Sequence, residues 1–209
     1  MDLDELKKLY DLGVKFDFIF FWGSKSKNSK VNNSCLSQFY KCCFEENGIK
    51  YNCCEQYMMA KKAELFDDKE ILNEIMEESN PKVIKSLGRK VRNFDSKIWN
   101  KNRINIVKNG NYLKFTQNEE LKEYLLSTND AILVEASPYD CIWGIGLSKE
   151  DKRSINPNMW KGKNYLGFVL MDVRGIIGMD WFRIYQITGS WYVQGMKLLD
   201  IWDKLLDVK

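Results

Sequence analysis

The chain has 209 residues, of which 44% are hydrophobic and 13% aromatic, a composition typical of globular proteins and not of disordered ones. Lys and Arg number 32 against 29 Asp and Glu, so the net charge is only +3, and the chain contains no histidine. Histidine-based acid–base catalysis, Ser-His-Asp and Cys-His nucleophiles and His-ligated metal sites are therefore excluded.

The start of the chain predicts one helix, one strand and one loop. Leucines recur at helical spacing in residues 2–12, so we expect a short helix there. Residues 16–22 (FDFIFFW) form an aromatic run typical of a buried strand. The polar residues 23–30 that follow predict a loop, and the acidic N-terminus does not resemble a secretory signal, so we expect a cytoplasmic protein.

A hairpin and a capped helix are predicted next. Asn47-Gly48 is a dipeptide preferred in type I′ turns, and residues 39–44 and 49–51 flank it as expected strands. Asn52 is a good N-cap and Glu55 follows three residues later, which is the pattern of a capping box. We therefore expect a helix from residue 55 towards residue 66.

Further helices and one strand complete the predicted fold. Residues 131–136 (AILVEA) are expected to form a buried strand, and residues 157–171 to close the core. We predict a mainly α (α+β) fold, a single helix-rich domain with a few short strands and a hairpin. The remaining helices are expected to begin after Asp67-Asp68, at Asn80-Pro81, after Asp95 and at Asn118, and to end near Asn80, Gly88, Asn109-Gly110 and Thr128.

The cysteines are interpreted as structural. A zinc site would need a spacing such as C-x-x-C, and adjacent pairs do not supply it. In the absence of a secretory signal we expect reduced thiols that serve as small buried hydrophobic residues. They are Cys35, Cys42, Cys43, Cys53, Cys54 and Cys141.

Glu55 and Lys62 form the first candidate functional pair. Residues seven apart on an α-helix differ by about 20° around the axis, so both share a face with Met58 and Met59. In one interpretation Glu55 closes the helix cap and Lys62 reaches solvent. In the other the face is a pocket wall, and the Lys62 amine, beside Lys61 and against apolar surface, has a lowered pKa and acts as a nucleophile.

Residues 134–146 (VEASPYDCIWGIG) are the second candidate. A carboxylate after a strand, followed by Trp143 and two glycines, resembles a ligand-binding loop. The alternative is a tight turn in which Asp140 accepts hydrogen bonds from its own backbone. Aromatic residues at the end of the first strand, Phe21 and Trp22 among them, stack on a base in one interpretation and belong to the core in the other.

The charges are unevenly distributed along the chain. Residues 64–78 carry seven acids and one lysine, whereas residues 82–114 carry ten Lys and Arg and a single acid, Asp95. Such a run is typical of a solvated helix face. Aromatic and Asn residues interleave with it, so an anionic ligand such as a pyrophosphate or a nucleic-acid backbone is the competing interpretation.

A set of ordered motifs over about residues 16–174 resembles the NADAR (YbiA-like) family. The motifs are Phe21-Trp22, Leu36-Ser37-Gln38, Glu55-Gln56-Tyr57-Met58-Met59-Ala60-x-Lys62-Ala63, Leu87-Gly88-Arg89, Phe94-Asp95, Trp99, Lys114-Phe115, Leu125-Leu126, Glu135-Ala136-Ser137, Asp140-x-Ile142-Trp143-Gly144-Ile145-Gly146-Leu147, Trp160-x-Gly162-x-Asn164-x-Leu166-Gly167 and Val173-Arg174.

The resemblance implies a mainly helical single domain with N-glycosidase activity. Family members remove ADP-ribose from modified guanine in DNA, some as antitoxins paired with a DNA ADP-ribosyltransferase toxin. Others are described as cleaving ribosylamino-pyrimidine intermediates of riboflavin synthesis. Both substrates join an exocyclic aryl amine to the anomeric carbon of a ribose, so one site can serve both. We expect residues 1–174 to form this domain and residues 175–209 to be a C-terminal extension, an amphipathic helix packed on the domain.

The expected catalytic residues are Glu55, Lys62 and Asp140. Glu55 would be the electrostatic or general-base carboxylate, Lys62 the amine nucleophile or ribose-positioning cation, and Asp140 a second acid or base. Direct hydrolysis and a Schiff base on Lys62 both remain open, and neither needs a metal or a cofactor. The residues expected to bind substrate are Phe21, Trp22, Gln38, Met58, Met59, Arg89, Trp99, Trp143 and Gly144, with Arg89 and the basic run holding phosphates.

A different class of function stays open. The chain could be a non-catalytic module that binds ADP-ribose or single-stranded nucleic acid through the basic stretch, and such a module would keep its ligand affinity in Glu55→Gln. The expected partners are ADP-ribosylated DNA or an ADP-ribose-containing small molecule, together with a cognate toxin and without a membrane. The basic run favours a nucleic-acid substrate over a phosphoribosyl group alone.

Overall fold

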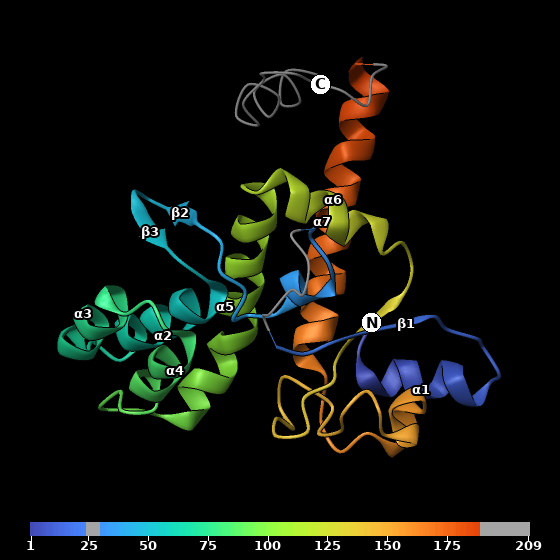
Figure 1. The fold of residues 1–209 in the computed structure, drawn as a ribbon, viewed down its shortest axis with the longest axis horizontal. Coiled ribbons are helices and arrows are strands. Elements are labelled where there is room, and N and C mark those ends of the chain that lie inside the picture. Colours follow the sequence, from blue (N-terminus) through green and yellow to red (C-terminus); the bar gives the residue numbers. More distant parts are fainter. Residues whose placement is uncertain (24–29, 189–209) are drawn as a thin grey trace. The chain divides into compact units, whose positions relative to one another are not determined.

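The computed structural model describes residues 1–23 and 30–188, and it divides into two compact units, residues 1–174 and residues 175–209. The expected mainly helical fold with a few short strands is confirmed (Figure 1). The helices are α1 (Leu3–Asp11), α2 (Cys54–Leu65), α3 (Lys69–Glu77), α4 (Pro81–Gly88), α5 (Ser96–Thr116), α6 (Glu119–Ser127) and α7 (Tyr165–Thr188).

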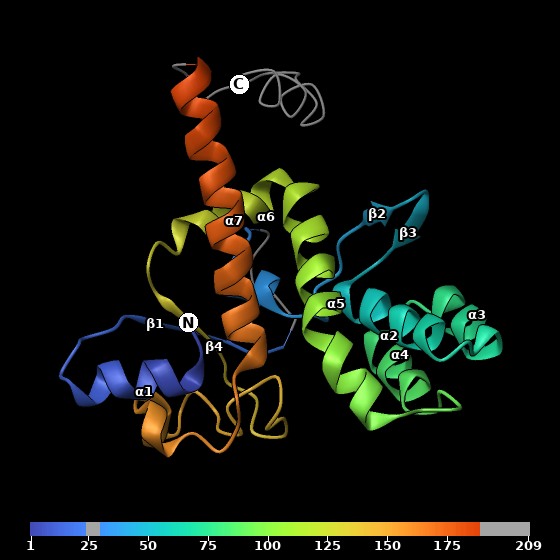
Figure 2. The same cartoon turned by 180° about the vertical axis from the view of Figure 1, so that it is seen from behind.

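Four short strands form two separate pairs. β1 (Phe18–Phe21) runs parallel to β4 (Ile132–Glu135), and Phe21 lies opposite Glu135 in the register. β2 (Phe44–Glu46) and β3 (Ile49–Tyr51) form the predicted hairpin, with Asn47 and Gly48 at positive φ angles of 52° and 82°. The parallel pair is seen from behind in Figure 2. Because the strands are parallel, their carboxyl ends meet at one edge, where Trp22 and Glu135 stand.

A hydrophobic core surrounds the parallel pair. Side chains from α1, β4, the segment 145–160 and α7 bury each other there, and aromatic residues of β1 pack against them. This burial removes most of the apolar surface of β4 from water and fixes the strand within the domain. The buried members are Leu6, Ile132, Val134, Ile145, Leu147, Trp160 and Phe168.

Helix α2 packs against α3, α4 and α5 and is buried along most of its length (Figure 1). α5 does not end at Asn109-Gly110, as the sequence suggested, but continues to Thr116. A Cβ at Gly110 would lie 2.6 Å from the ring of Tyr57 on α2. This glycine therefore serves the close approach of two helices and does not terminate α5.

The predicted cap of α2 is wrong by one residue. Cys53 is the N-cap, and its Sγ accepts a hydrogen bond from the backbone N–H of Gln56. The Gln56 side chain accepts the return bond from the backbone N–H of Asn52 at 2.8 Å, so Gln56 takes the part that the sequence suggested for Glu55. Glu55 lies at the second helical position, and its carboxyl group takes no part in the cap.

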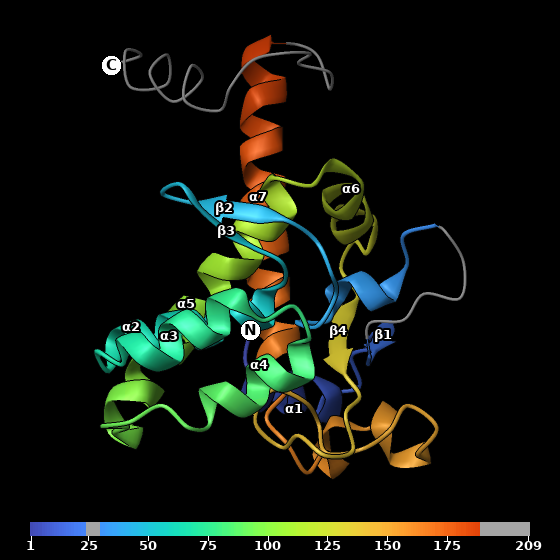
Figure 3. The ribbon, with the colours of Figure 1, turned by 60° about the vertical axis from the view of Figure 1, so that its left-hand side comes forward.

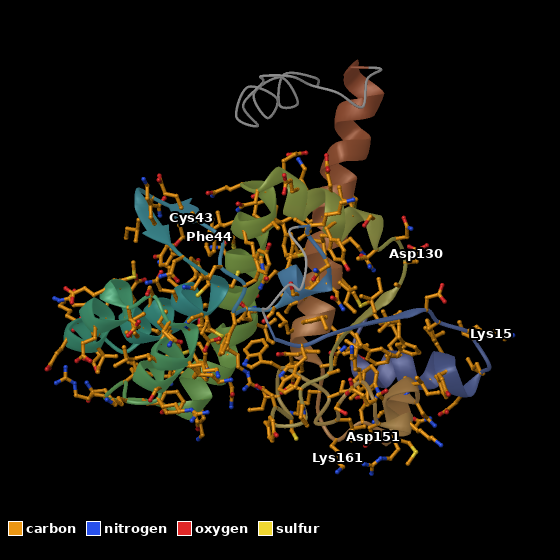
Figure 4. The ribbon with its side chains drawn as sticks, viewed as in Figure 1. Lys15, Cys43, Phe44, Asp130, Asp151 and Lys161 are labelled. Atoms are coloured by element: carbon orange, nitrogen blue, oxygen red, sulfur yellow. The ribbon has the colours of Figure 1, made fainter. Side chains whose placement is uncertain are left out.

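Two further expectations are corrected at the hairpin. The strand expected over residues 39–44 begins only at Phe44, because a two-residue turn at Asn47-Gly48 pairs Glu46 with Ile49. Of the six cysteines, Cys35, Cys53 and Cys54 are buried as expected, Cys42 is half-buried, and Cys43 and Cys141 are exposed. Figure 4 shows Cys43 beside Phe44 at the start of β2.

Asn164, just before α7, holds the end of β4 in place. The residue has a positive φ of 52°, its amide nitrogen donates to the carbonyl of Leu133, and its amide oxygen accepts from the backbone N–H of Glu135. A Cβ at Gly167, in the first turn of α7, would overlap the Leu133 carbonyl. The motif Asn164-x-Leu166-Gly167 thus positions the backbone of Glu135.

The second unit begins inside α7, which continues from Gly175 to Thr188. The apolar positions 196–206 that predicted an amphipathic helix, and part of the polar loop expected over residues 23–30, lie outside the described residues. In the part of the chain that the structure describes, no helix has the length and apolar character required to cross a membrane.

Candidate active site

A cleft of about 580 Å³ lies between α2, α4 and the carboxyl edge of the β1–β4 pair. This volume falls within the range of small-molecule sites. Figure 3 shows α4 in front of the chain that continues from β4. Both segments contribute to the lining, and Lys85 Nζ on α4 lies 3.7 Å from Asp140 Oδ2 on the loop after β4. We call this pocket the cleft.

Glu55 is the most deeply buried acid of the cleft. Only 2% of the residue is exposed, and its Oε1 has no hydrogen-bond partner within the described residues. The pKa of Glu55 is raised to about 7, mainly by burial and also by the Asp140 carboxylate, whereas Lys85 and Arg89 oppose the shift. The idea that Glu55 merely closes the helix cap is therefore wrong, and its carboxyl group is available to a ligand.

Gln38 presents a second unsatisfied polar group. The residue is 8% exposed, and neither its amide oxygen nor its amide nitrogen has a partner in the described part of the chain. Its backbone carbonyl accepts from the N–H of Glu55 at 3.0 Å, which ties the two residues together. A buried amide without partners is costly, so its presence in a cleft indicates a place where a ligand supplies the hydrogen bonds.

Lys62 lies seven residues further along α2 than Glu55, on the same face of the helix. Its Nζ donates to the carbonyl of Gly88 at 2.6 Å and lies 4.3 Å from the ring centroid of Phe94 and 5.7 Å from that of Trp99. Burial lowers the pKa of Lys62. Its neighbour Lys61 points elsewhere and pairs with Glu46 and Glu64.

Asp140 forms the tight turn that the sequence offered as one alternative. Its Oδ1 accepts from the backbone N–H groups of Ile142 at 2.9 Å and Trp143 at 2.8 Å. Its Oδ2 faces Lys85 at 3.7 Å and lines the cleft. The residue therefore both shapes the loop and presents a carboxylate oxygen to the cleft.

Glu135 is the acid that sequence reasoning missed. It ends β4, its side chain lines the cleft, and its Oε2 is inaccessible and without a partner in the described residues. The pKa of Glu135 is raised to about 8, mainly by burial and also by the charges of Asp140 and Glu55, whereas Lys85 opposes the shift. The signal was its place at the carboxyl end of a buried strand, which in parallel sheets is where ligands bind.

The outer part of the cleft is aromatic on one side and cationic on the other. Trp22 and Tyr139 are 56% and 87% exposed, and their ring centroids lie 6.1 Å apart. Across the cleft, α4 contributes Lys82 and Lys85, and its C-cap residue is Arg89. Their spacing of three and four residues places them on one helix face, a signal that the sequence already contained.

The basic run does not form one surface. Arg92 binds Asp68 and Glu70, Lys108 pairs with Asp172 at 2.9 Å, and Lys114 is fully buried. The Lys114 ammonium donates to the backbone carbonyls of Cys35 and Ser37. Only the α4 members of the run line the cleft.

Most of the predicted site residues meet in the cleft. Two do not, because Phe21 is 2% exposed in the core and Gly144 is buried against the backbone carbonyl of Glu135. The lining also includes Ser137, the basic-run residues Lys82 and Lys85, and the unforeseen Glu135 and Tyr139. The predicted residues that line the cleft are Trp22, Gln38, Glu55, Met58, Met59, Lys62, Arg89, Trp99, Asp140 and Trp143.

Metal ligation was not expected from the sequence. Among residues 1–23 and 30–188, no group of three or more Cys, Asp or Glu side chains is arranged to hold a metal ion. The chemistry considered below uses the carboxyl, amide, amine and aromatic groups of the cleft.

Comparisons with known proteins point to one family. The family model described as "NADAR domain" matches residues 20–177. The chain is 46% identical over 162 residues to N-glycosidase R617 of Acanthamoeba polyphaga mimivirus, which covers 75% of this chain and 94% of that protein. It is 29% identical over 143 residues, 68% of this chain and 35% of the relative, to Riboflavin biosynthesis protein VVA0006 of Vibrio vulnificus. The NMR structure of the Escherichia coli protein YbiA matches with a TM-score of 0.64 and 26% identity, covering 80% of this chain and 88% of that one.

Proposed function

Because the chain belongs to the NADAR domain family, whose model matches residues 20–177, we propose that it is an N-glycosidase that hydrolyses the bond between ribose C1′ and an exocyclic aryl amine. The activity named for the mimivirus relative supports this reaction class. The observation that carries the proposal is the unpartnered Glu55 carboxyl at the base of a cleft with an aromatic and a cationic side. Such a carboxyl can stabilise an oxocarbenium-like transition state and activate water.

The preferred substrate of this proposal is ADP-ribose attached to guanine in DNA. A pyrophosphate requires cations, and the α4 residues Lys82, Lys85 and Arg89 provide three in the cleft. The exposed rings of Trp22 and Tyr139 are suited to stack on a base. A DNA ADP-ribosyltransferase would supply this substrate, so the proposal includes such an enzyme as a functional partner.

Direct hydrolysis is the route we propose. Water attacks C1′, the Glu55 carboxylate takes one proton of that water, and the C1′–N bond breaks with its electron pair going to nitrogen, which takes up a proton from an acid of the cleft or from water and leaves as the free amine. Lys62, held by the Gly88 carbonyl, orients the ribose or a phosphate as a cation. Borohydride trapping of a covalent adduct that disappears in Lys62→Ala would replace this route by a Schiff base.

The first test is turnover of a DNA oligonucleotide ADP-ribosylated on guanine, with free ADP-ribose detected by mass spectrometry. We expect release by the wild type and a loss of about 10²- to 10⁴-fold in Glu55→Gln. The matched control is Glu64→Gln, on the exposed side of the same helix, which should keep wild-type turnover. Equal turnover by wild type and Glu55→Gln would contradict the proposed role of Glu55.

A phosphoribosylamino-pyrimidine is the second candidate substrate. The observation in its favour is the relative named for riboflavin biosynthesis, together with a cleft whose three cations suffice for a single phosphate. The two substrates are compared by kcat/KM on the same preparation. Release from neither, with a ligand affinity that survives Glu55→Gln, would establish a non-catalytic binding module instead.

A further inference from the structure

We infer that Glu135 is the general acid of this cleft and gives its proton to the departing amine nitrogen, while Glu55 serves as the base. The inference rests on the proposed glycosidase reaction and goes beyond it by naming the proton donor. It assigns to Glu135 a role that the sequence suggested for Asp140.

The backbone of Glu135 is held rigidly at the edge of the cleft. Its N–H donates to Asn164 Oδ1 at 3.0 Å, and its carbonyl accepts from the N–H of Ile145 at 3.0 Å. A Cβ at Gly144 would lie 2.7 Å from this carbonyl, so the glycine allows the loop to pack closely against it. A side chain on a fixed strand end can be aimed more accurately than one on a loop.

The three acids of the cleft have different surroundings. Asp140 accepts two backbone hydrogen bonds and faces Lys85, so both of its carboxylate oxygens have a protein partner. Glu135 Oε2 and Glu55 Oε1 have no hydrogen-bond partner within the described residues, and both residues line the cleft. Asp140 is thus engaged by protein groups, and the two glutamates have oxygens left to exchange protons with a ligand.

Burial is the main reason that both glutamates have a raised pKa, and charged neighbours modify it. Asp140 acts on both acids, Lys85 opposes it at both, and Arg89 acts on Glu55. The pKa of Glu135 is raised to about 8 and that of Glu55 to about 7. Burial favours the protonated form of both glutamates, whereas the charge of Arg89 acts on Glu55 and favours its ionised form, so we assign the proton to Glu135 and the role of base to Glu55.

The resulting step balances in protons and electrons. The C1′–N bond breaks and its electron pair goes to nitrogen, which takes the proton of Glu135. A C1′–O bond forms to water, and the second proton of that water goes to Glu55. One water is consumed, the products are the free amine and the ribosyl hemiacetal, and transfer of one proton from Glu55 to Glu135 restores the starting state.

The experiment compares two leaving groups on one sugar, ribose 5-phosphate carrying either an aryl amine or 4-nitrophenolate at C1′. An amine needs a proton to depart, and nitrophenolate does not. For Glu135→Gln we expect a loss of about 10²- to 10⁴-fold in kcat with the amine and a much smaller loss with nitrophenolate. Glu55→Gln should slow both substrates.

The pH profile gives an independent readout. With the amine substrate, wild-type kcat/KM should fall as pH rises through the pKa of Glu135, because only the protonated acid donates. This alkaline limb should vanish in Glu135→Gln and persist in Asp140→Asn, whatever the remaining rate of that variant. If Glu135→Gln does not fold by circular dichroism, Glu135→Asp replaces it, with the same selective loss for the amine substrate.

The outcomes separate the inference from the function on which it rests. A wild-type protein inactive on both substrates and on the ADP-ribosylated oligonucleotide overturns the glycosidase and the inference together. A wild type that turns over the amine substrate, with Glu135→Gln equally active or equally slowed on both leaving groups, overturns the inference and leaves the glycosidase in place.

Discussion

At the scale of single residues, the cleft contains groups that oppose folding. Glu55 is buried with an unpartnered carboxyl oxygen, and Gln38 beside it has an unpartnered amide. Such groups persist in a stable protein because the surrounding helices bury enough apolar surface to offset their cost. The unsatisfied groups thus distinguish the cleft from the core, where Asn164 and Lys114 are fully hydrogen-bonded.

The raised pKa of Glu55 predicts a pH-dependent penalty on stability. The pKa is about 7 in the folded chain against 4.5 when exposed, so the unfolded chain ionises first as pH rises. The folded state is therefore destabilised between about pH 4.5 and pH 7, and the penalty stays constant above that range. Its size is on the order of 3 kcal/mol.

Glu55→Gln should remove this penalty. We expect the variant to have a higher Tm than the wild type at pH 8 and a much smaller difference at pH 4.5, measured by calorimetry. Glu64→Gln, exposed at the far end of the same helix, is the control and should not change the difference between the two pH values. If Glu55→Gln were less stable than the wild type at pH 8, the claim that ionising the buried Glu55 carboxyl destabilises the folded state would be contradicted.

The sequence predicted which site residues meet when they lie on one helix. It did not predict those that meet through the pairing of distant strands. Glu55 and Lys62 share a helix face by their spacing alone, and both line the cleft. Glu135 enters the cleft because β4 pairs with β1, and no local pattern shows which strand a four-residue segment will pair with. The shift of the α2 cap to Cys53 was missed because a cysteine is rarely expected to cap a helix.

At the scale of secondary-structure elements, glycines decide how closely the elements pack. Gly110 was interpreted as a helix end, although it allows α5 to approach Tyr57 of α2. Gly167 lies where α7 meets β4, against the Leu133 carbonyl. In both cases the sequence shows the glycine but not the neighbouring element, and only the tertiary packing tells which use it has.

A pair of glycines in one helix gives a matched test of this packing. Gly167→Ala would force α7 away from β4, and we expect a loss of about 1 to 3 kcal/mol in the free energy of unfolding and a lower kcat. At Gly175, in the same helix, an added Cβ has no neighbour within 4 Å in the described structure. Gly175→Ala should be neutral or up to about 1 kcal/mol stabilising. Equal effects of the two substitutions, measured by urea unfolding, would contradict the packing role of Gly167.

At the scale of the whole molecule, the cations of the basic run lie in different places and make different contacts. Three of its members on α4 line the cleft, while Arg92, Lys108 and Lys114 are engaged in internal contacts. Net charge along the sequence therefore overstated the surface available to an anion. The fold class was predictable because helix caps and the spacing of apolar residues are local features of the sequence. Whether a given Lys or Arg lines the cleft or pairs with another residue depends on partners that are distant in the sequence.

This division predicts different effects for two cations of the run. Arg89→Ala should raise KM several-fold with kcat nearly unchanged, and reduce the salt dependence of log kcat/KM by about one unit of slope. Lys101→Ala, exposed on α5 and outside the cleft lining, is the matched control and should leave both quantities at wild-type values. An Arg89→Ala enzyme with normal KM and a lost kcat would instead place Arg89 in the chemistry.

The parallel pairing of β1 with β4 has a consequence for the timing of folding. Phe18 pairs with Ile132, so a long intervening chain must be ordered before this contact closes, and the pair contributes to a high contact order. During synthesis, the cleft cannot be complete until β4 and the Asn164 bridge have left the ribosome. A nascent chain that ends before that point has α2 and its Glu55, but the carboxyl edge that faces them does not yet exist. Activity should therefore appear only late in elongation, after nearly the whole first unit has been made.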